Sequence, residues 1–70
     1  MKKIVVLGAG MVGKAMAIDL AKKYAVTSVD ISQNSLDSLS KQNISTILAD
    51  LKNKEKVAEI VKDFDLVISA

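Results

Sequence analysis

The sequence predicts an α/β fold in which strands and helices alternate to build a doubly wound parallel sheet. Four short apolar runs rich in Val, Ile and Leu alternate with three segments of helical periodicity, and a glycine-rich turn joins the first run to the first helix. The chain has no proline-rich or glycine-rich linker and no internal repeat. Because crossovers between parallel strands are right-handed, we expect the element order βαβαβαβ and the strand order 3-2-1-4.

The first predicted strand leads directly into the glycine turn. Residues 4–7, IVVL, are followed by GAGMVG at residues 8–13. Gly8 permits a tight turn, Gly10 lets a diphosphate approach the backbone, and Gly13 lets the helix pack closely on the strand. The start of the helix adds N–H groups and the positive end of the helix dipole, which suit an anion. The sequence therefore predicts a dinucleotide site, with contacts from Gly8, Ala9, Gly10, Met11, Val12 and Gly13.

A second motif overlaps the same residues. Gly8, Gly13 and Lys14 also match GxxxxGK, the phosphate loop of nucleoside triphosphatases, in which the next residue is Ser or Thr and binds magnesium. Here the next residue is Ala15, whose methyl group cannot bind a metal. The central Gly10 also favours the dinucleotide turn. We expect Lys14 to be a solvated residue of the first helical turn, with a phosphate contact as the alternative.

The first helix is amphipathic and leads to a second strand that ends on an acid. Residues 25–30, AVTSVD, predict this strand, and Asp30 lies at its carboxyl end. A carboxylate there can accept hydrogen bonds from the hydroxyls of an adenosine ribose. The alternative role of Asp30 is to cap a helix or turn. An acid about 20 residues after a glycine turn of this kind completes the signature of a Rossmann-type fold. The apolar face of the helix carries Gly13, Ala17, Leu20, Ala21 and Tyr24.

Asp30 also bears on the choice between NAD and NADP. Its negative charge would repel a phosphate on the same ribose, and the chain has no arginine to bind one. NAD is therefore the predicted cofactor, with NADP as the alternative.

The alternation of helix and strand continues after Asp30. Residues 34–41 predict a short second helix, and residues 44–49 predict a third strand. Asp50 follows this strand, where it either accepts a hydrogen bond from an adenine amino group or starts the next turn. We keep both roles open for Asp50.

A third helix and a fourth strand complete the pattern. Asn53 is expected to cap the helix, and residues 66–70, LVISA, predict the strand. The buried face of the third helix is expected to carry Val57, Ile60 and Val61.

Composition excludes several classes of function. The chain has neither cysteine nor histidine, so no disulfide, thiolate or imidazole is available, and no catalytic group or metal site is evident. The lysines are scattered, and Tyr24 and Phe64 lie apart from any basic cluster, which disfavours nucleic-acid binding. No apolar run is long enough for a membrane span or a signal peptide, so we expect a cytoplasmic protein.

Seventy residues allow one domain with a small core. The fourth strand would leave an uncovered sheet edge. We therefore expect residues 1–70 to be the N-terminal portion of a larger dinucleotide-binding domain, with further strands and a substrate domain beyond it. We also keep a homodimer as a possible assembly.

Over essentially its whole length, the chain resembles the N-terminal cofactor domain of the saccharopine dehydrogenase and lysine dehydrogenase family. The resemblance rests on KIVVLGAGMVGKAMAIDLAK at the start, the acid after VTSV, ADL at residues 49–51, and DFDLVISA at the end. It implies a nicotinamide cofactor and hydride transfer to or from an amino acid or its imine adduct. The family's substrate-binding groups lie in a later domain, so none is carried over.

The resemblance also implies where each part of the cofactor lies. The pyrophosphate would lie on the glycine turn, the adenosine ribose at Asp30, and the adenine near Asp50. The contacts that complete this set, from the ribose to the nicotinamide side, are Ile31, Ser32, Leu51, Ser69 and Ala70.

A regulatory NAD-sensing domain of a potassium transport system is the alternative function. Such domains look similar in their glycine turn, their second-strand acid and the acid after the third strand. Their third-strand acid commonly follows a glycine, whereas here Ala49 precedes Asp50, which favours the enzyme. A short-chain reductase fits less well because its glycine turn is spaced differently.

Overall fold

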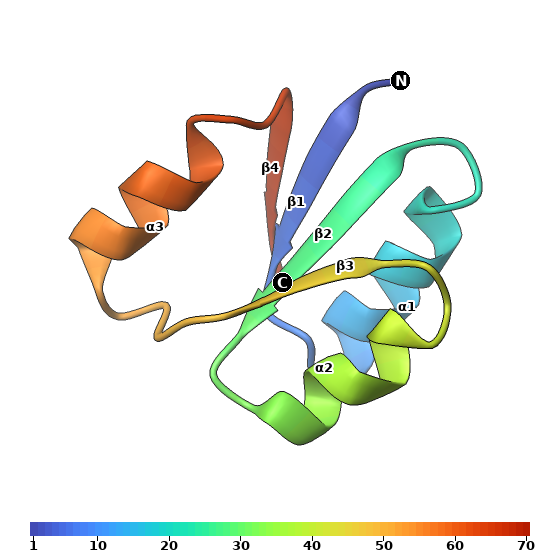
Figure 1. Cartoon of the computed structure of the whole chain (residues 1–70), viewed down its shortest axis with the longest axis horizontal. Coiled ribbons are helices and arrows are strands. Elements are labelled where there is room, and N and C mark those ends of the chain that lie inside the picture. The colour runs from blue at the N-terminus through green and yellow to red at the C-terminus, as the bar shows by residue number, and fades with distance from the viewer.

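The computed structural model describes all 70 residues and shows one twisted sheet with three helices around it (Figure 1). Strands and helices alternate from the first strand to the last, as predicted. The bounds are β1 Lys3–Leu7, α1 Met11–Leu20, β2 Ala25–Asp30, α2 Gln33–Ser40, β3 Ser45–Leu48, α3 Lys54–Val61 and β4 Leu66–Ser69.

All four strands are parallel, and their order across the sheet is β3-β2-β1-β4, which confirms the predicted topology. In the middle of the sheet, Val5 of β1 pairs with Thr27 of β2 on one side and with Val67 of β4 on the other. The chain moves outward from β1 to β3 and then crosses back to β4. Sheets of this kind bind ligands outside the carboxyl ends of the strands, at the point where the strand order reverses.

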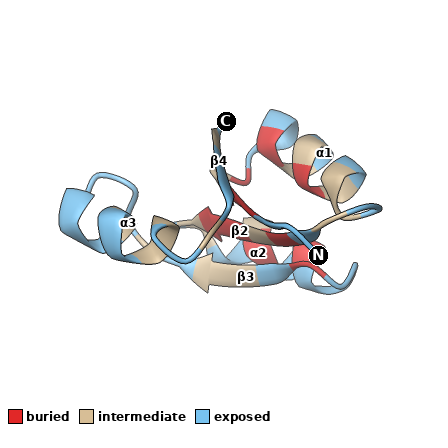
Figure 2. Ribbon diagram, turned by 90° about the horizontal axis from the view of Figure 1, so that it is seen from above, coloured by how far each residue is buried: buried red, intermediate tan, exposed pale blue.

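The hydrophobic core lies between the sheet and the helices α1 and α2, which both pack on one face (Figure 2). Alternate residues of a strand point to opposite faces, so Ile4 and Val6 of β1 enter this core while Val5 faces the other side. Small residues on α1 let its backbone approach the strands closely. The buried residues that form the core are Ile4, Val6, Ala9, Ala17, Val26, Leu36, Leu39 and Ile44.

The third helix does not cover the other face of the sheet. The prediction that this helix has a buried face was therefore wrong. Val57, Ile60 and Val61 were expected to form a buried face, but α3 has no buried residue and stands to one side (Figures 1 and 2). Half of the residues of this short helix are charged, so its apolar area is small. A groove of about 440 Å³ separates α3 from the sheet and is lined in part by Ile47 and Phe64.

The ends of several elements differ by a few residues from the predicted ones. Helix α1 ends before Tyr24, which nevertheless packs against the core. Helix α2 begins at Gln33 rather than at residue 34, because Ser32 is its N-cap and accepts a hydrogen bond from the N–H of Ser35 through its Oγ atom. Asn53 caps α3, as predicted. Strand β3 is one residue shorter at each end than residues 44–49.

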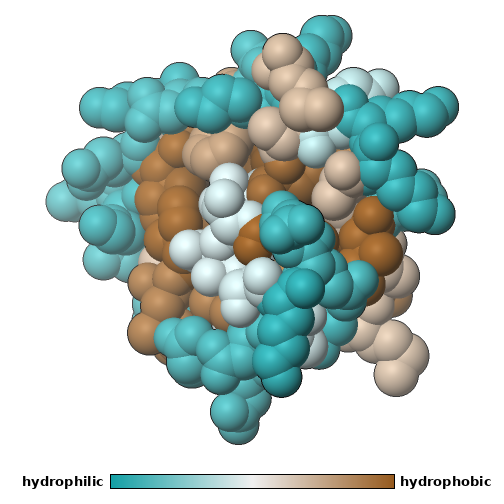
Figure 3. All heavy atoms as spheres, turned by 45° about the vertical axis from the view of Figure 1, so that its right-hand side comes forward, coloured by the Kyte–Doolittle hydropathy of each residue, from teal (hydrophilic) through white to brown (hydrophobic).

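Some apolar side chains lie on the surface rather than in the core. Those of Met11, Val12 and Ile31 are 91%, 68% and 66% exposed, and all three follow the carboxyl end of a strand. Figure 3 shows apolar patches between hydrophilic side chains on one side of the molecule. None of the helices combines the length and the apolar character that a membrane crossing requires.

The buried hydroxyl of Ser28 leads to a prediction about stability. Ser28 lies on β2 with no exposed surface, and its Oγ atom has no hydrogen-bond partner. Because an unsatisfied buried polar group is unfavourable, we expect Ser28→Ala to raise the free energy of unfolding by about 1 kcal/mol. Urea denaturation of the intact protein measures this change. The control, Ser45→Ala at an exposed position of β3, should change it by less than about 0.5 kcal/mol; a loss of stability in Ser28→Ala would contradict the interpretation.

Candidate functional site

The residues predicted to bind the cofactor gather at the carboxyl edge of the sheet, because each follows or ends a parallel strand. The glycine turn follows β1, Asp30 ends β2, Asp50 follows β3, and Ser69 ends β4. The N–H of Ala70 donates a hydrogen bond of 3.0 Å to the last carbonyl of β1, so the end of β4 lies beside the glycine turn. Asp50 lies on the other side of β2, just after the edge strand β3.

The three glycines of the turn differ in how much space a side chain would have. Gly8 has a φ of +111°, a left-handed conformation that other residues rarely adopt, and a Cβ there would lie 2.9 Å from the carbonyl oxygen of Ala70. A Cβ at Gly13 would collide with the carbonyl oxygen of Gly8. A Cβ at Gly10 would meet no atom within 4 Å. The protein itself therefore leaves free the space over Gly10, where a diphosphate is expected.

The backbone around Gly10 provides free hydrogen-bond donors. Gly10 is the N-cap of α1 and has no side chain that could accept from the first N–H groups. The N–H of Lys14 donates to the carbonyl of Gly10 at 2.8 Å, and the N–H groups of residues 11–13 have no partner within the helix. These donors, together with the positive end of the helix dipole, suit an anion such as a diphosphate.

Asp30 connects the end of β2 to the glycine turn. Its Oδ2 atom accepts a hydrogen bond of 2.6 Å from the N–H of Ala9, and its Oδ1 atom accepts one of 3.0 Å from the N–H of Ser32. The bond from Ser32 and then the bond from Ala9 lower the pKa of the Asp30 carboxyl below 3.8, against a smaller opposing effect of burial. Asp30 is therefore a carboxylate at neutral pH.

The sequence had left open whether Asp30 only caps a turn or helix. The cap of α2 is Ser32 and not Asp30, although the bond from the Ser32 N–H does shape the turn after β2. The bond to Ala9 was not expected from the sequence. Nothing in the spacing of residues 9 and 30 reveals it, because it depends on how β1 and β2 pair.

Asp50 starts the turn after β3, which was one of its two expected roles. Its Oδ1 atom accepts a hydrogen bond of 2.9 Å from the N–H of Lys52, and its carbonyl accepts one of 3.0 Å from the N–H of Asn53. Asp50 is exposed, and Leu51 is 36% exposed beside it. A contact of Asp50 with adenine stays a prediction.

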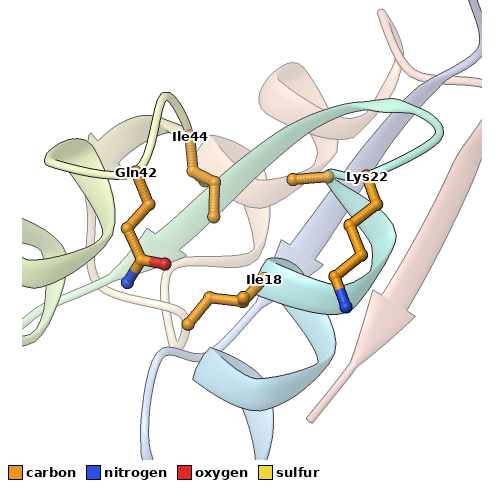
Figure 4. Close-up of a pocket in the computed structure, with 5 residues that line it drawn as sticks. Ile18, Lys22, Gln42 and Ile44 are labelled. Atoms are coloured by element: carbon orange, nitrogen blue, oxygen red, sulfur yellow. The ribbon is translucent and has the colours of Figure 1, made fainter.

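Of the cavities that residues of α1 help to line, only one lies at the glycine turn. This cavity has a volume of about 490 Å³ and is lined by Gly10, Lys14 and Ser35, among others. Another, of about 260 Å³, lies near the other end of the helix, where Lys22 and Ile44 line it (Figure 4). No group of three or more acidic, histidine or cysteine side chains that could hold a metal is present.

The comparisons with known proteins agree with this geometry. A family model described as "Saccharopine dehydrogenase NADP binding domain" matches residues 4–70. The chain belongs to this family. Among solved structures, apo saccharopine dehydrogenase (L-Glu forming) from Saccharomyces cerevisiae is similar, with a TM-score of 0.83 and 27% sequence identity. The match covers 99% of this chain but 16% of the yeast enzyme. No curated protein sequence matched the chain.

Membership of the saccharopine dehydrogenase family establishes the class of ligand. The chain is a Rossmann-type dinucleotide-binding domain, and its cofactor is NAD or NADP. The open space over Gly10 and the donors at the start of α1 fit the diphosphate of such a cofactor. Nothing in the comparisons supports a sensor of a potassium transport system.

The lowered pKa of Asp30 predicts how stability depends on pH. Because the folded state holds this pKa below 3.8, the carboxylate contributes stability above the unfolded pKa, and this contribution disappears as pH falls through the folded pKa. We expect Asp30→Asn to lose less stability than the wild type between pH 7 and pH 3, measured by urea denaturation. Asp63→Asn, at an exposed carboxylate that accepts no hydrogen bond, is the control and should follow the wild-type pH profile. Identical profiles for Asp30→Asn and the wild type would contradict the role of the two backbone bonds.

Proposed function

We propose that this chain binds NAD(H) as the cofactor part of an oxidoreductase that transfers hydride between the nicotinamide and an amino acid or its imine adduct. The observation that carries the proposal is the open glycine turn with the Asp30 carboxylate beside it. The name of the similar yeast enzyme, saccharopine dehydrogenase (L-Glu forming), supports amino-acid chemistry. Since the chain spans about one sixth of that enzyme, the reaction and substrate are proposed by family membership.

Each part of the cofactor has a proposed place along the edge of the sheet. The free N–H groups of residues 11–13 would bind the pyrophosphate. Each oxygen of Asp30 accepts one backbone N–H and retains lone pairs for the hydroxyls of the adenosine ribose. The turn that begins at Asp50 would lie against the adenine, and Ser69 and Ala70 would face the nicotinamide side. The bound dinucleotide supplies the hydride chemistry, and the protein positions it.

We further propose that NAD binds more tightly than NADP. The Asp30 carboxylate is charged, and a phosphate on the same ribose would lie close to it. The chain has no arginine that could form a bidentate pair with such a phosphate. The family description refers to NADP, so this preference concerns the residues of this chain and not the family as a whole.

We also propose that residues 1–70 form part of a larger domain, with the catalytic groups in other segments. Leu66 and Val67 on the edge strand β4 are 51% and 43% exposed. One edge of β4 is unpaired, and α3 leaves part of one sheet face open. These features favour a further strand and a covering helix. Assembly as a homodimer stays a prediction.

The first test of the cofactor site compares two glycines of the same turn. Gly10→Val places a side chain in the space proposed for the diphosphate, so we expect the affinity for NAD to fall at least ~tenfold, while the free energy of unfolding changes by less than about 1 kcal/mol. Gly13→Ala is expected to destabilise the fold by about 1 to 3 kcal/mol, because its Cβ collides with backbone. Isothermal titration calorimetry and urea denaturation of the intact protein measure the two effects. Unchanged NAD affinity in Gly10→Val would overturn the site.

The second test concerns the ribose. Asp30→Ser removes the charge that opposes a ribose phosphate, so we expect the ratio of NAD to NADP affinity to fall roughly tenfold. Titration of both cofactors into the wild type and the variant gives this ratio. Asp37→Ser, which removes an exposed acid from α2, is the charge-matched control and should leave the ratio unchanged. A constant ratio in Asp30→Ser would contradict the proposed role of Asp30.

A further inference from the structure

The cavity of about 490 Å³ beside the glycine turn lies between α1 and α2. Gly10, Met11, Lys14 and Ile18 of the turn and α1 line it on one side, and Ser35 of α2 lines it on the other. Lys14 is the only charged residue among those that line it. The cavity is therefore a mostly apolar hollow with one cation and one hydroxyl at its wall.

Neither of these two polar side chains has a partner in the protein. Lys14 is half-buried, and the single ion pair in the structure joins Lys22 to Asp19 elsewhere on α1. The Oγ atom of Ser35 takes part in no hydrogen bond, although its backbone N–H donates to Ser32. Both groups are thus free to bind a ligand.

The cavity adjoins the proposed ribose site through Ala9, although Asp30 itself does not line it. Ala9, which also lines the cavity, donates its N–H to Oδ2 of Asp30. On the α2 side, the backbone N–H of Ser35 donates a hydrogen bond to Oγ of Ser32. The N–H of Ser32 in turn donates to Oδ1 of Asp30. Lys14 and Asp30 themselves form no ion pair. The cavity thus lies next to the residues that hold Asp30, and no salt bridge between Lys14 and Asp30 would have to be broken by a ligand.

We propose that this cavity is the subsite for a phosphate on the adenosine ribose, with the Lys14 ammonium and the Ser35 hydroxyl as its ligands. A phosphate monoester carries about −1.5 to −2 charges at pH 7 and three acceptor oxygens, and an ammonium offers three donors. Lys14 then favours NADP while Asp30 opposes it, and the two residues together set the ratio of affinities. This inference rests on the dinucleotide site proposed above.

The experiment measures the affinity of the intact protein for NAD+ and NADP+ by isothermal titration calorimetry. Lys14→Ala is compared with the unaltered chain, both with Asp30 present and in an Asp30→Ser background, which lacks the charge that opposes a ribose phosphate. We expect Lys14→Ala to weaken NADP+ binding at least ~tenfold, because a charge-assisted hydrogen bond is lost, and to change NAD+ binding less than ~twofold. Ser35→Ala should weaken NADP+ binding by a smaller factor.

A control and a pair of fragments isolate the phosphate. Lys23→Ala removes the same charge at an exposed position after α1, so it reports the effect of net charge alone. Adenosine 2′,5′-bisphosphate and adenosine 5′-monophosphate differ only in the phosphate concerned. Lys14→Ala should weaken binding of the bisphosphate and leave that of the monophosphate unchanged.

Three results would overturn the subsite. An equal loss of NAD+ and NADP+ affinity in Lys14→Ala would assign Lys14 to the pyrophosphate, and the dinucleotide site would stand. Unchanged affinity for both cofactors in either background would show that the cavity binds no phosphate. Absence of binding of both cofactors to the wild-type protein would overturn the proposed function together with the subsite.

Discussion

The hydrogen bond from the Ala9 N–H to the Asp30 carboxylate joins the glycine turn after β1 to the end of β2, and the geometry of the candidate site depends on it. The bond is 2.6 Å long and connects residues 21 positions apart. Its acceptor is ionised, which makes such a bond shorter and stronger than one between neutral groups. With the bond from the Gly8 N–H to the carbonyl of Val29, it fixes the glycine turn against β2. The free N–H donors at the start of α1 and the carboxylate proposed to bind the ribose are thereby held close together.

Close approach of backbone segments is the second constraint on this edge of the sheet. Gly13 has no room for a Cβ against the carbonyl of Gly8, and Gly8 has none against Ala70. The start of α1, the end of β1 and the end of β4 therefore lie in direct contact. By contrast, α3 lies away from the sheet and contributes no buried residue. The geometry of the glycine turn thus depends on β1, α1, β2 and the end of β4.

The family and the fold settle the class of cofactor, while the side chains around the ribose decide its exact form. A nicotinamide dinucleotide follows from membership of the saccharopine dehydrogenase family and from the turn itself. The choice between NAD and NADP depends on charges near one ribose hydroxyl, which the backbone does not determine. In this chain the Asp30 carboxylate lies beside the glycine turn. The unpaired Lys14 helps to line the adjoining cavity between α1 and α2. In the subsite proposed above, their opposite charges would act on the same phosphate with opposite sign.

The sequence by itself determined the alternation of elements, the strand order, the three glycines of the turn and the N-cap Asn53, because these depend on local periodicity, short spacings and the handedness of crossovers. It also placed Asp30 at the end of β2. Only the tertiary structure decided that Asp30 bonds to Ala9, that Lys14 and Ser35 share a cavity, and that Val57, Ile60 and Val61 are not buried. Most of these features depend on the distance and orientation of segments far apart in the chain. Side-chain packing sets those distances, and no local pattern encodes them.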